Sequence, residues 1–304
     1  MEKLDMFIRY MNIMGRSKNT IKQFPRYIEE FSDVTKATTV EDYKVLKLSD
    51  FESYLEALQE KGNSDATRNT KLSAVKSFFK YLSDNDLIDK NIADRVNHSK
   101  TQKKLSVQPT REEAKKILDS VKRKPKLHTL YTLLMNSGLR IEEALSLRIQ
   151  DFRDGCIFVI NGKGGKDRVV PINSKAQERL QKYIATERKV WSRESLVERH
   201  NGDKKLVQKA WEDKDLIFLG KNGLRMFNSN VNASMDYTAE RCNISKDKVH
   251  PHAFRHYFAN EFVKQGGRVQ DLQSQLGHAS LKTTQIYFDN DTTQVQKAMN
   301  GMTF

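Results

Sequence analysis

Hydrophobic side chains recur at intervals of three and four residues through the first third of the chain, which places them on single faces of α-helices. Three such stripes consist of Ile21, Phe24, Ile28 and Phe31, of Phe51, Tyr54, Leu55 and Leu58, and of Leu72, Val75, Phe78, Phe79 and Leu82. Residues 1–97 are therefore predicted to be all helical, with the stripes buried as a common core.

Capping residues predict where these helices begin. The run Ser17-Lys18-Asn19-Thr20 offers N-cap residues ahead of the first stripe, and Ser64 or Asp65 precedes the last. The run Leu48-Ser49-Asp50 is expected to cap the helix between them. Pro25 is expected near the first turn of its helix, where a missing N–H is tolerated.

The helical pattern breaks at residues 98–109, which are polar, basic and without periodicity, as is typical of a linker. Thr110 and Glu113 then have the spacing of a capping box, which opens a new helix. We therefore predict two domains, a helical N-terminal domain of residues 1–97 and a C-terminal domain of residues 110–304.

The predicted C-terminal domain combines helices with one short stretch of β-structure. Residues 127–135 have the composition of a buried helix, which Ser137 and Gly138 end. The runs 156–160 and 168–172 are rich in β-branched residues and flank a Gly-rich turn, so they predict a hairpin. The fold class is therefore mainly α with a small β-hairpin or sheet.

The excess positive charge is confined to the second part of the chain. The chain carries 53 Lys and Arg against 39 Asp and Glu, a formal net charge of +14. Residues 1–97 hold 16 of each sign, so residues 98–304 hold 37 basic and 23 acidic side chains. Such a surface favours a polyanionic partner, most often nucleic acid.

Cysteine content and hydropathy bound the cellular setting. Cys156 and Cys242 are the two cysteines and form no motif, which argues against a disulfide framework or a cysteine-ligated metal. No run approaches the roughly 18 apolar residues that span a bilayer, and the first residues lack the apolar core of a signal peptide. A cytoplasmic location without a membrane partner is therefore expected.

The densest candidate chemistry lies in residues 249–287. His252 and Arg255 are three residues apart and share one face of a helix. His278 follows in a Leu-Gly-His motif, and Tyr287 comes nine residues later. A guanidinium, two imidazoles and a phenol in one segment suit a site that binds an oxyanion and attacks it.

Upstream residues extend this set. Arg140 begins a helix, and Glu143, one turn later, is positioned to hold its guanidinium. Lys163 lies in the Gly-rich turn between the predicted strands, with Lys166 as a neighbouring alternative. That turn does not match a nucleotide-binding P-loop, because no Ser or Thr follows the Lys and a strand follows in place of a helix.

The set resembles the active site of a tyrosine recombinase, of the phage integrase and Xer family, and comprises Arg140, Lys163, His252, Arg255, His278 and Tyr287. The resemblance implies a site-specific DNA recombinase that joins Tyr287 to a 3′-phosphate and reverses the step with a 5′-hydroxyl. It implies that Glu143 supports Arg140, that Lys163 is the catalytic lysine in preference to Lys166, and that no metal or cofactor is required. It also implies that the N-terminal domain is a SAM-like core-binding domain.

The residue types suit these roles. A phenol with a pKa near about 10 is a weak nucleophile at neutral pH, and nearby cations favour its ionised form. Arg140 and Arg255 can each donate two hydrogen bonds to phosphate oxygens. His252 and His278 add donors or a proton relay, and Lys163 can protonate the leaving 5′ oxygen.

Two other protein classes share parts of this pattern. A type IB topoisomerase-like enzyme uses the same chemistry to relax DNA, and a DNA-binding protein without catalysis would need only the basic surface. The complete set of residues argues against the second alternative. A metal site at His252 and His256 is disfavoured because Arg255 puts a fixed positive charge between them.

Partners follow from the resemblance and from charge. Double-stranded DNA sites are expected, bound by a homotetramer on two sites. Exposed basic residues are candidates for DNA contacts, with a solvated face as the alternative, and they are Arg68, Lys71, Lys76, Lys100, Lys103 and Lys104. Val295, Ala298, Met299 and Met302 form an apolar stripe on a C-terminal helix that either docks on a neighbouring protomer or packs on its own domain. The charged segment 182–215 is expected to be a surface elaboration.

Overall fold

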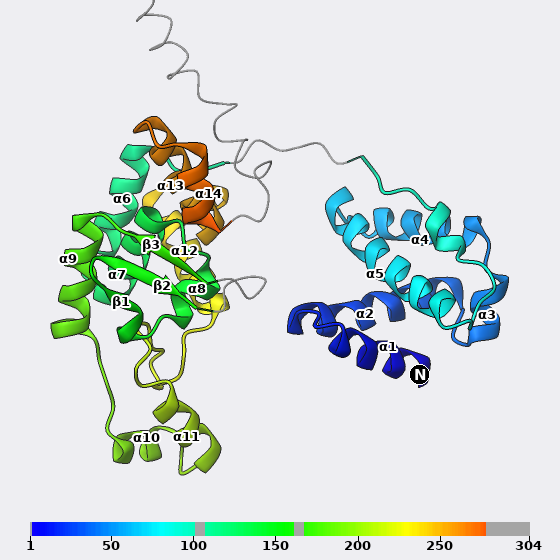
Figure 1. Cartoon of the computed structure of the whole chain (residues 1–304), viewed down its shortest axis with the longest axis horizontal. Coiled ribbons are helices and arrows are strands. Elements are labelled where there is room, and N and C mark those ends of the chain that lie inside the picture. Colours follow the sequence, from blue (N-terminus) through cyan, green and yellow to red (C-terminus); the bar gives the residue numbers. More distant parts are fainter. Residues whose placement is uncertain (1, 101–106, 161–166, 278–304) are drawn as a thin grey trace, which may run out of the picture. The chain divides into compact units, whose positions relative to one another are not determined.

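The computed structural model describes residues 2–100, 107–160 and 167–277 (Figure 1). The chain divides into two compact units, residues 1–104 and 105–304, and the division falls inside the segment 98–109. Each unit has its own apolar core. The mainly helical, two-domain fold predicted from the sequence is therefore confirmed.

The first unit is built from helices alone within its described residues. They are α1 (Glu2–Ile13), α2 (Lys18–Thr35), α3 (Val40–Val45), α4 (Leu48–Glu60), α5 (Asp65–Asp84) and the 3-10 helix η1 (Ile92–Arg95). Aromatic rings form the centre of the core, where Phe31 lies 5.0 Å from Phe51 and 5.1 Å from Tyr54, measured between ring centroids. The predicted stripes thus meet in one core.

The predicted caps are correct in two of the three cases. Ser17 and Ser64 accept hydrogen bonds from the amides of the third residue beyond each, as N-caps do. The helix between them, α4, differs: Leu48 is already its first helical residue, and the Asp50 carboxylate accepts from the amide of Lys47. The short helix α3 was not predicted.

Pro25 lies in the interior of α2 and not near its first turn, because Ser17 caps the helix one residue before Lys18. The proline ring therefore removes one hydrogen bond from the middle of the helix. The helix continues past it because Ile28 and Phe31 are buried in the core. Tertiary packing outweighs the local cost at this position.

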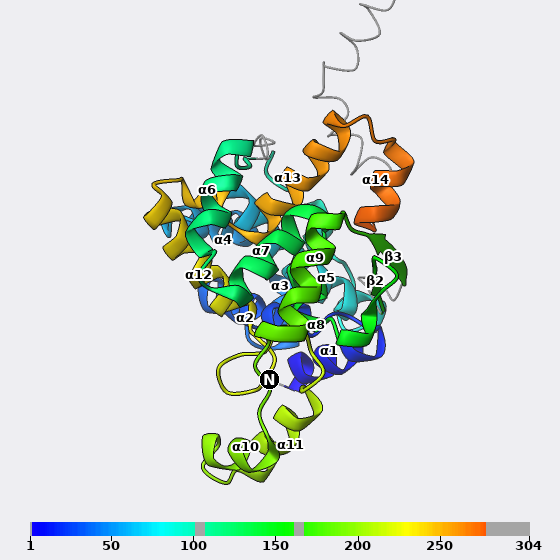
Figure 2. The same cartoon turned by 90° about the vertical axis from the view of Figure 1, so that its left-hand side faces the viewer.

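The second unit surrounds a central helix with helices and a small sheet (Figure 2). Its helices are α6 (Arg111–Val121), α7 (Pro125–Ser137), α8 (Ile141–Ser146), α9 (Ser174–Lys182), α10 (Arg193–Arg199), α11 (Lys204–Glu212), α12 (Asn228–Cys242), α13 (Pro251–Lys264) and α14 (Val269–Leu276). Shorter turns are η2 (Ile149–Asp151), the π-helical η3 (Tyr183–Glu187) and η4 (Lys246–Lys248). The strands are β1 (Phe152–Arg153), β2 (Cys156–Val159) and β3 (Arg168–Pro171).

The strands form an antiparallel sheet in the order β1-β2-β3. Cys156 pairs with Pro171 and Val159 pairs with Arg168, which is the predicted hairpin with one further short strand at its edge. Arg168 is the first residue of β3 and follows soon after residues 161–166, the segment that contains Lys163. Lys163 itself lies outside the described residues.

Helix α7 is the centre of the second unit and packs against α6, α9 and α13. Its residues Leu130, Tyr131 and Leu134 are fully buried, as the apolar composition predicted. Gly138 ends the helix with a left-handed backbone, φ +66°. A Cβ at Gly138 would lie 2.5 Å from the ring of Phe258, so the close packing of α13 requires glycine there.

Helices α10 and α11 project from the body of the unit in both views (Figures 1 and 2). They enclose a small separate core of Leu196, Val207, Ala210 and Leu224. This segment belongs to the region expected to be a surface elaboration. Among the described residues, no helix has the length and apolar character needed to cross a membrane.

Candidate active site

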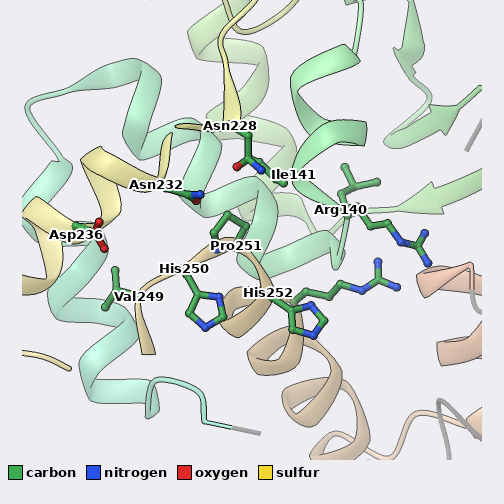
Figure 3. Close-up of a pocket in the computed structure, with 11 residues that line it drawn as sticks. Arg140, Ile141, Asn228, Asn232, Asp236, Val249, His250, Pro251 and His252 are labelled. Carbon is green, nitrogen blue, oxygen red and sulfur yellow. The ribbon is translucent and has the colours of Figure 1, made fainter. Parts of the chain in front are cut away.

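A hollow of about 760 Å³ opens between the start of α8, one face of α12 and the start of α13. Its polar lining consists of Arg140, Asn228, Asn232, Asp236, His250, His252 and Arg255. In Figure 3, Arg140 enters from the opposite side to Asn232 and Asp236, and the two histidines lie between them. The three catalytic candidates within the described residues, Arg140, His252 and Arg255, are thus brought together from segments more than 100 residues apart in sequence.

Arg255 is almost fully buried, with 4% of its surface exposed. Its guanidinium donates to the carbonyl oxygen of Gly138 at 2.5 Å and to that of Leu276 at 2.8 Å. Both carbonyls lie at helix C-termini, of α7 and α14, where the partial charge is negative. These ends hold the buried cation in one orientation at the wall of the hollow.

Arg140 is the N-cap of α8 and is more exposed than Arg255, at 28% of its side chain. Its Nη1 donates to Glu143 Oε1 at 2.9 Å, and its Nη2 donates to the carbonyl of Gly277 at 3.2 Å. Gly277 has φ +63°, and a Cβ there would lie 3.1 Å from the Arg168 side chain. Gly277, the glycine of the Leu-Gly-His motif, therefore lets the end of α14 approach Arg140 and Arg168.

Glu143 is the carboxylate on which this cluster depends. It accepts from Arg140, from the Arg140 amide at 2.8 Å, and from both terminal nitrogens of Arg168 at 2.9 and 2.7 Å. Burial by itself would raise the pKa of Glu143, but the hydrogen bonds from Arg168 and Arg140 outweigh it and hold the pKa below its usual value. A permanent negative charge therefore bridges two guanidiniums.

Arg168 was missed by the sequence pattern. It stands 25 residues after Glu143 and reaches it because β3 packs against α14, where Arg168 Nε donates to the Gln275 carbonyl at 3.1 Å. Gln275 in turn donates to the carbonyls of Ser137 and Pro171 at 3.2 and 3.0 Å. No local motif marks such long-range pairs.

His252 lies three residues before Arg255 on α13, as predicted. Burial lowers its pKa, and the nearby charges of Arg255, His250 and Arg140 lower it further. The imidazole is therefore neutral at pH 7 and can donate and accept one hydrogen bond each. His256, the second histidine of the disfavoured metal pair, packs edge-on against His252 with ring centroids 4.2 Å apart.

His250 was also missed. Its Nδ1 accepts from the Ala253 amide at 3.2 Å, so it is the N-cap of α13, and Pro251 takes the first helical position. The His-Pro pair at the start of a predicted helix was the available signal. The cap fixes the start of the helix that carries His252 and Arg255.

Three predicted catalytic residues, Lys163, His278 and Tyr287, lie outside the described residues. In sequence, His278 directly follows Gly277, whose carbonyl binds Arg140. The structure therefore describes Arg140, Glu143, His252 and Arg255 of the predicted set.

The DNA-contact candidates on α5 are engaged within their own unit. Arg68 donates to Gln59 Oε1 at 2.6 Å and pairs with Asp65, Lys71 pairs with Glu30 at 2.7 Å, and Lys76 donates to the Val96 carbonyl at 2.8 Å. Lys100 is exposed, and Lys103 and Lys104 lie outside the described residues. Contact of the α5 cations with DNA would require that these bonds be shared or exchanged.

The fold is shared with solved integrases. The Tn1549 transposon integrase, solved in complex with transposon right end DNA, superposes with a TM-score of 0.74 over 98% of both chains at 19% identity. Two family descriptions match the sequence, "Phage integrase family" over residues 108–294 and "Phage integrase, N-terminal SAM-like domain" over residues 4–85. The chain therefore belongs to the phage integrase family.

Curated relatives agree with this assignment. Tyrosine recombinase XerA of Pyrococcus horikoshii is 31% identical over 300 residues, which cover 97% of this chain and 92% of the relative. Tyrosine recombinase XerC of Oceanobacillus iheyensis is 28% identical over 291 residues, covering 93% and 90%. These likenesses support the recombinase interpretation and not the topoisomerase alternative.

Proposed function

We propose that Tyr287 is the nucleophile of this site-specific DNA recombinase and that Arg140 and Arg255 bind the phosphate it attacks. The proposal rests chiefly on one observation: the two guanidiniums share the wall of one hollow, each oriented by a helix-end carbonyl. Two guanidiniums, each with paired N–H donors, suit the nonbridging oxygens of a phosphodiester.

In the proposed reaction the Tyr287 oxygen forms a bond to phosphorus as the bond from phosphorus to the 5′ oxygen breaks. The phenol proton passes to a base, and Lys163 gives a proton to the leaving oxygen. Arg140 and Arg255 neutralise the charge that develops on the phosphorane. The 3′-phosphotyrosyl bond conserves the energy of the phosphodiester, and the 5′-hydroxyl of another strand reverses the step.

His252 and His278 complete the proposed proton chemistry. A neutral His252 suits either donation to a phosphate oxygen or acceptance of the Tyr287 proton. Glu143 is a positioning residue in this scheme, because it contacts the arginine and not the substrate. The residues assigned to catalysis need neither a metal ion nor a nucleotide.

The proposed assembly is a homotetramer on two double-stranded DNA sites, with the C-terminal helix exchanged between protomers in a closed ring. Residues 1–97 would bind the core site, the basic segment 98–109 would lie along the backbone, and residues 110–304 would catalyse. Lys100, Lys103, Lys104 and the cations of α5 are the proposed phosphate contacts. The location is cytoplasmic, in association with the nucleoid.

The direct test of this function is covalent capture on genomic DNA. The protein is incubated with fragmented DNA, denatured, and recovered with any attached strand, whose ends are then sequenced. We expect attachment at 3′-phosphates within one recurring sequence. Attachment without a recurring sequence would contradict site-specific recombination.

Replacement of Lys163 is expected to slow cleavage while leaving DNA affinity largely intact. In Lys163→Ala, a substrate with a 5′-bridging sulfur should recover most of the lost rate, since a thiolate leaves without a general acid. The measurement is single-turnover cleavage of both substrates. Recovery in Lys166→Ala in place of Lys163→Ala would assign the role to Lys166.

Removal of residues 294–304 is expected to leave a folded protein that binds one half-site normally. An amphipathic segment this short is marginal alone, and the proposal gives it a neighbouring protomer as its docking surface. Cooperative binding to paired sites should therefore be lost in gel-shift titrations. Unchanged cooperativity would reject the exchange, and a collapsed melting temperature would indicate that the tail packs on its own domain.

A further inference from the structure

A second hollow, of about 580 Å³, lies at the opposite end of α7 from the candidate active site. Its walls come from the first turn of α7, the segment after η3, α10 and the turn beyond Leu219. The 13 residues of α7 separate it from the Gly138 carbonyl by about 20 Å of helix. It is therefore distinct from the hollow that holds Arg140 and Arg255.

Positive charge dominates this second hollow. Its lining includes Lys126, Lys189, Arg199 and Lys221, with Lys124 at the rim, where its ammonium lies 5.0 Å from the centre of the Tyr237 ring. Within residues 2–100, 107–160 and 167–277, none of these five cations forms an ion pair with a carboxylate. The single acidic lining residue, Glu187, is already paired with Arg179 and Lys182.

Lys126 is the most buried of the lining cations. Its ammonium donates to the carbonyl of Leu219. Burial lowers the pKa of Lys126, and the charges of Lys221 and Lys189 lower it further. A half-buried ammonium beside two others is stabilised when an anion neutralises them. The amides of the first turn of α7 add partial positive charge on the same side.

The walls of the hollow are held in place by specific contacts. Arg199 lies over the ring of Trp191, 5.3 Å from its centre, and donates to the Lys221 carbonyl at 3.3 Å. The next carbonyl, of Asn222, is hydrogen-bonded to His200 at 2.9 Å. Gly223 has φ +81°, and a Cβ there would lie 2.7 Å from Leu196, so the turn that carries Lys221 packs closely on α10. The hollow therefore combines two cations held by specific contacts, Lys126 and Arg199, with the exposed side chains of Lys189 and Lys221 and a half-exposed indole.

We propose that this hollow binds a nucleotide, with its phosphates against Lys126, Lys189 and Lys221 and its base near Trp191. The volume lies within the range of small-ligand pockets, roughly 300 to 1,000 Å³. Cations clustered in a concavity recognise phosphate, and a base can stack on a planar guanidinium such as that of Arg199, which lies over the Trp191 ring. A free nucleoside triphosphate and the unpaired end of a nucleic-acid strand share this chemistry. The proposal is independent of the strand-transfer function.

Trp191 provides the readout. The chain has two tryptophans, so the full-length Trp211→Phe protein carries Trp191 as its sole indole. We expect ATP to change its fluorescence saturably, inorganic triphosphate to compete, and adenosine to bind far more weakly. A short single-stranded oligothymidylate tests whether the ligand is the unpaired end of a nucleic-acid strand. Tighter binding of the oligonucleotide than of ATP would identify a strand end as the ligand.

Charge-matched variants separate the site from general attraction. Lys126→Gln with Lys221→Gln should raise the Kd for the tighter-binding probe about tenfold or more, since each change removes a charged partner of phosphate. Lys204→Gln with Lys205→Gln removes the same charge from exposed positions on α11 that do not line the hollow, and should change Kd less than about twofold. Melting curves establish that both variants are folded.

Three outcomes overturn the proposal. They are the absence of saturable binding by both ATP and the oligonucleotide, an equal loss of affinity in the two variants, and binding of inorganic triphosphate without any binding of ATP or oligonucleotide. DNA cleavage is measured in parallel and should be unchanged in Lys126→Gln with Lys221→Gln. Absence of nucleotide binding at this hollow would therefore not affect the assignment of Tyr287 as the nucleophile. Equally, failure of that assignment would not affect the proposed nucleotide site.

Discussion

Tyr287→Phe should abolish covalent attachment to DNA while leaving binding unchanged. The substitution removes only the phenolic oxygen, so the contacts of the arginines with phosphate are kept and the bond to phosphorus cannot form. We expect strand cleavage to fall by about 10⁴-fold or more, the order of loss that follows removal of a covalent nucleophile. The measurement is a denaturing gel of protein mixed with a nicked, labelled site, beside a gel-shift titration.

An exposed tyrosine of the described residues serves as the matched control. Tyr237 is exposed on α12, a different helix from those that carry the arginines, so Tyr237→Phe should retain the adduct. An adduct that survives denaturant in Tyr287→Phe would identify another nucleophile. Loss of DNA binding in the same variant would show that the phenol has a structural role, and the comparison of the two gels separates these cases.

The sequence pattern predicted those parts of the fold that depend on interactions between residues close together in the chain. The stripes at Phe31 and Phe78 became the first core, and the capping box at Thr110 is present, with Glu113 accepting from the Thr110 amide at 2.8 Å. The predicted strands pair as β2 and β3, which are rich in the β-branched residues that favour extended backbone. In each case the signal and its cause lie within a few residues of each other.

The candidate residues of the site and one support, Glu143, were predicted from residue types and order, whereas the other supports were not. Arg140 and Arg255 were identified by motif, whereas the carbonyls of Gly138 and Gly277 that orient them have no side chain to signal a role. Arg168 reaches Glu143 through the packing of β3 on α14, which no local spacing encodes. Pro25 shows the same limit, since core contacts keep α2 intact around it. These contacts come from tertiary packing, which short sequence motifs do not encode.

Glu143→Gln should cost both stability and catalysis. The Glu143 side chain is 8% exposed and holds Arg140 and Arg168, so a neutral amide leaves two guanidiniums facing each other without their shared counter-charge. Breaking a buried pair in this way typically costs about 3–5 kcal/mol of unfolding free energy. Cleavage should fall as well, because Arg140 loses the partner that orients it. Chemical denaturation and single-turnover cleavage measure the two effects.

Glu142 provides the control at the adjacent position. It pairs with Arg225 at 2.8 Å but is 63% exposed, so Glu142→Gln should change stability by less than about 1 kcal/mol. The double variant Glu143→Gln with Arg168→Met should regain part of the stability, since one uncompensated buried cation is gone, yet remain slow in cleavage. Recovery of full cleavage in the double variant would contradict the positioning role of Glu143.

The pH dependence of stability gives an independent check on the charge of Glu143. Its folded pKa is held below the unfolded value of about 4.3, so the carboxylate stabilises the fold above that pH and loses this effect as pH falls through the folded pKa. The difference in unfolding free energy between the wild type and Glu143→Gln should therefore be constant above about pH 5 and shrink below it. A difference that does not change between pH 7 and pH 3 would mean that Glu143 acts through its shape and hydrogen bonds and not through its charge.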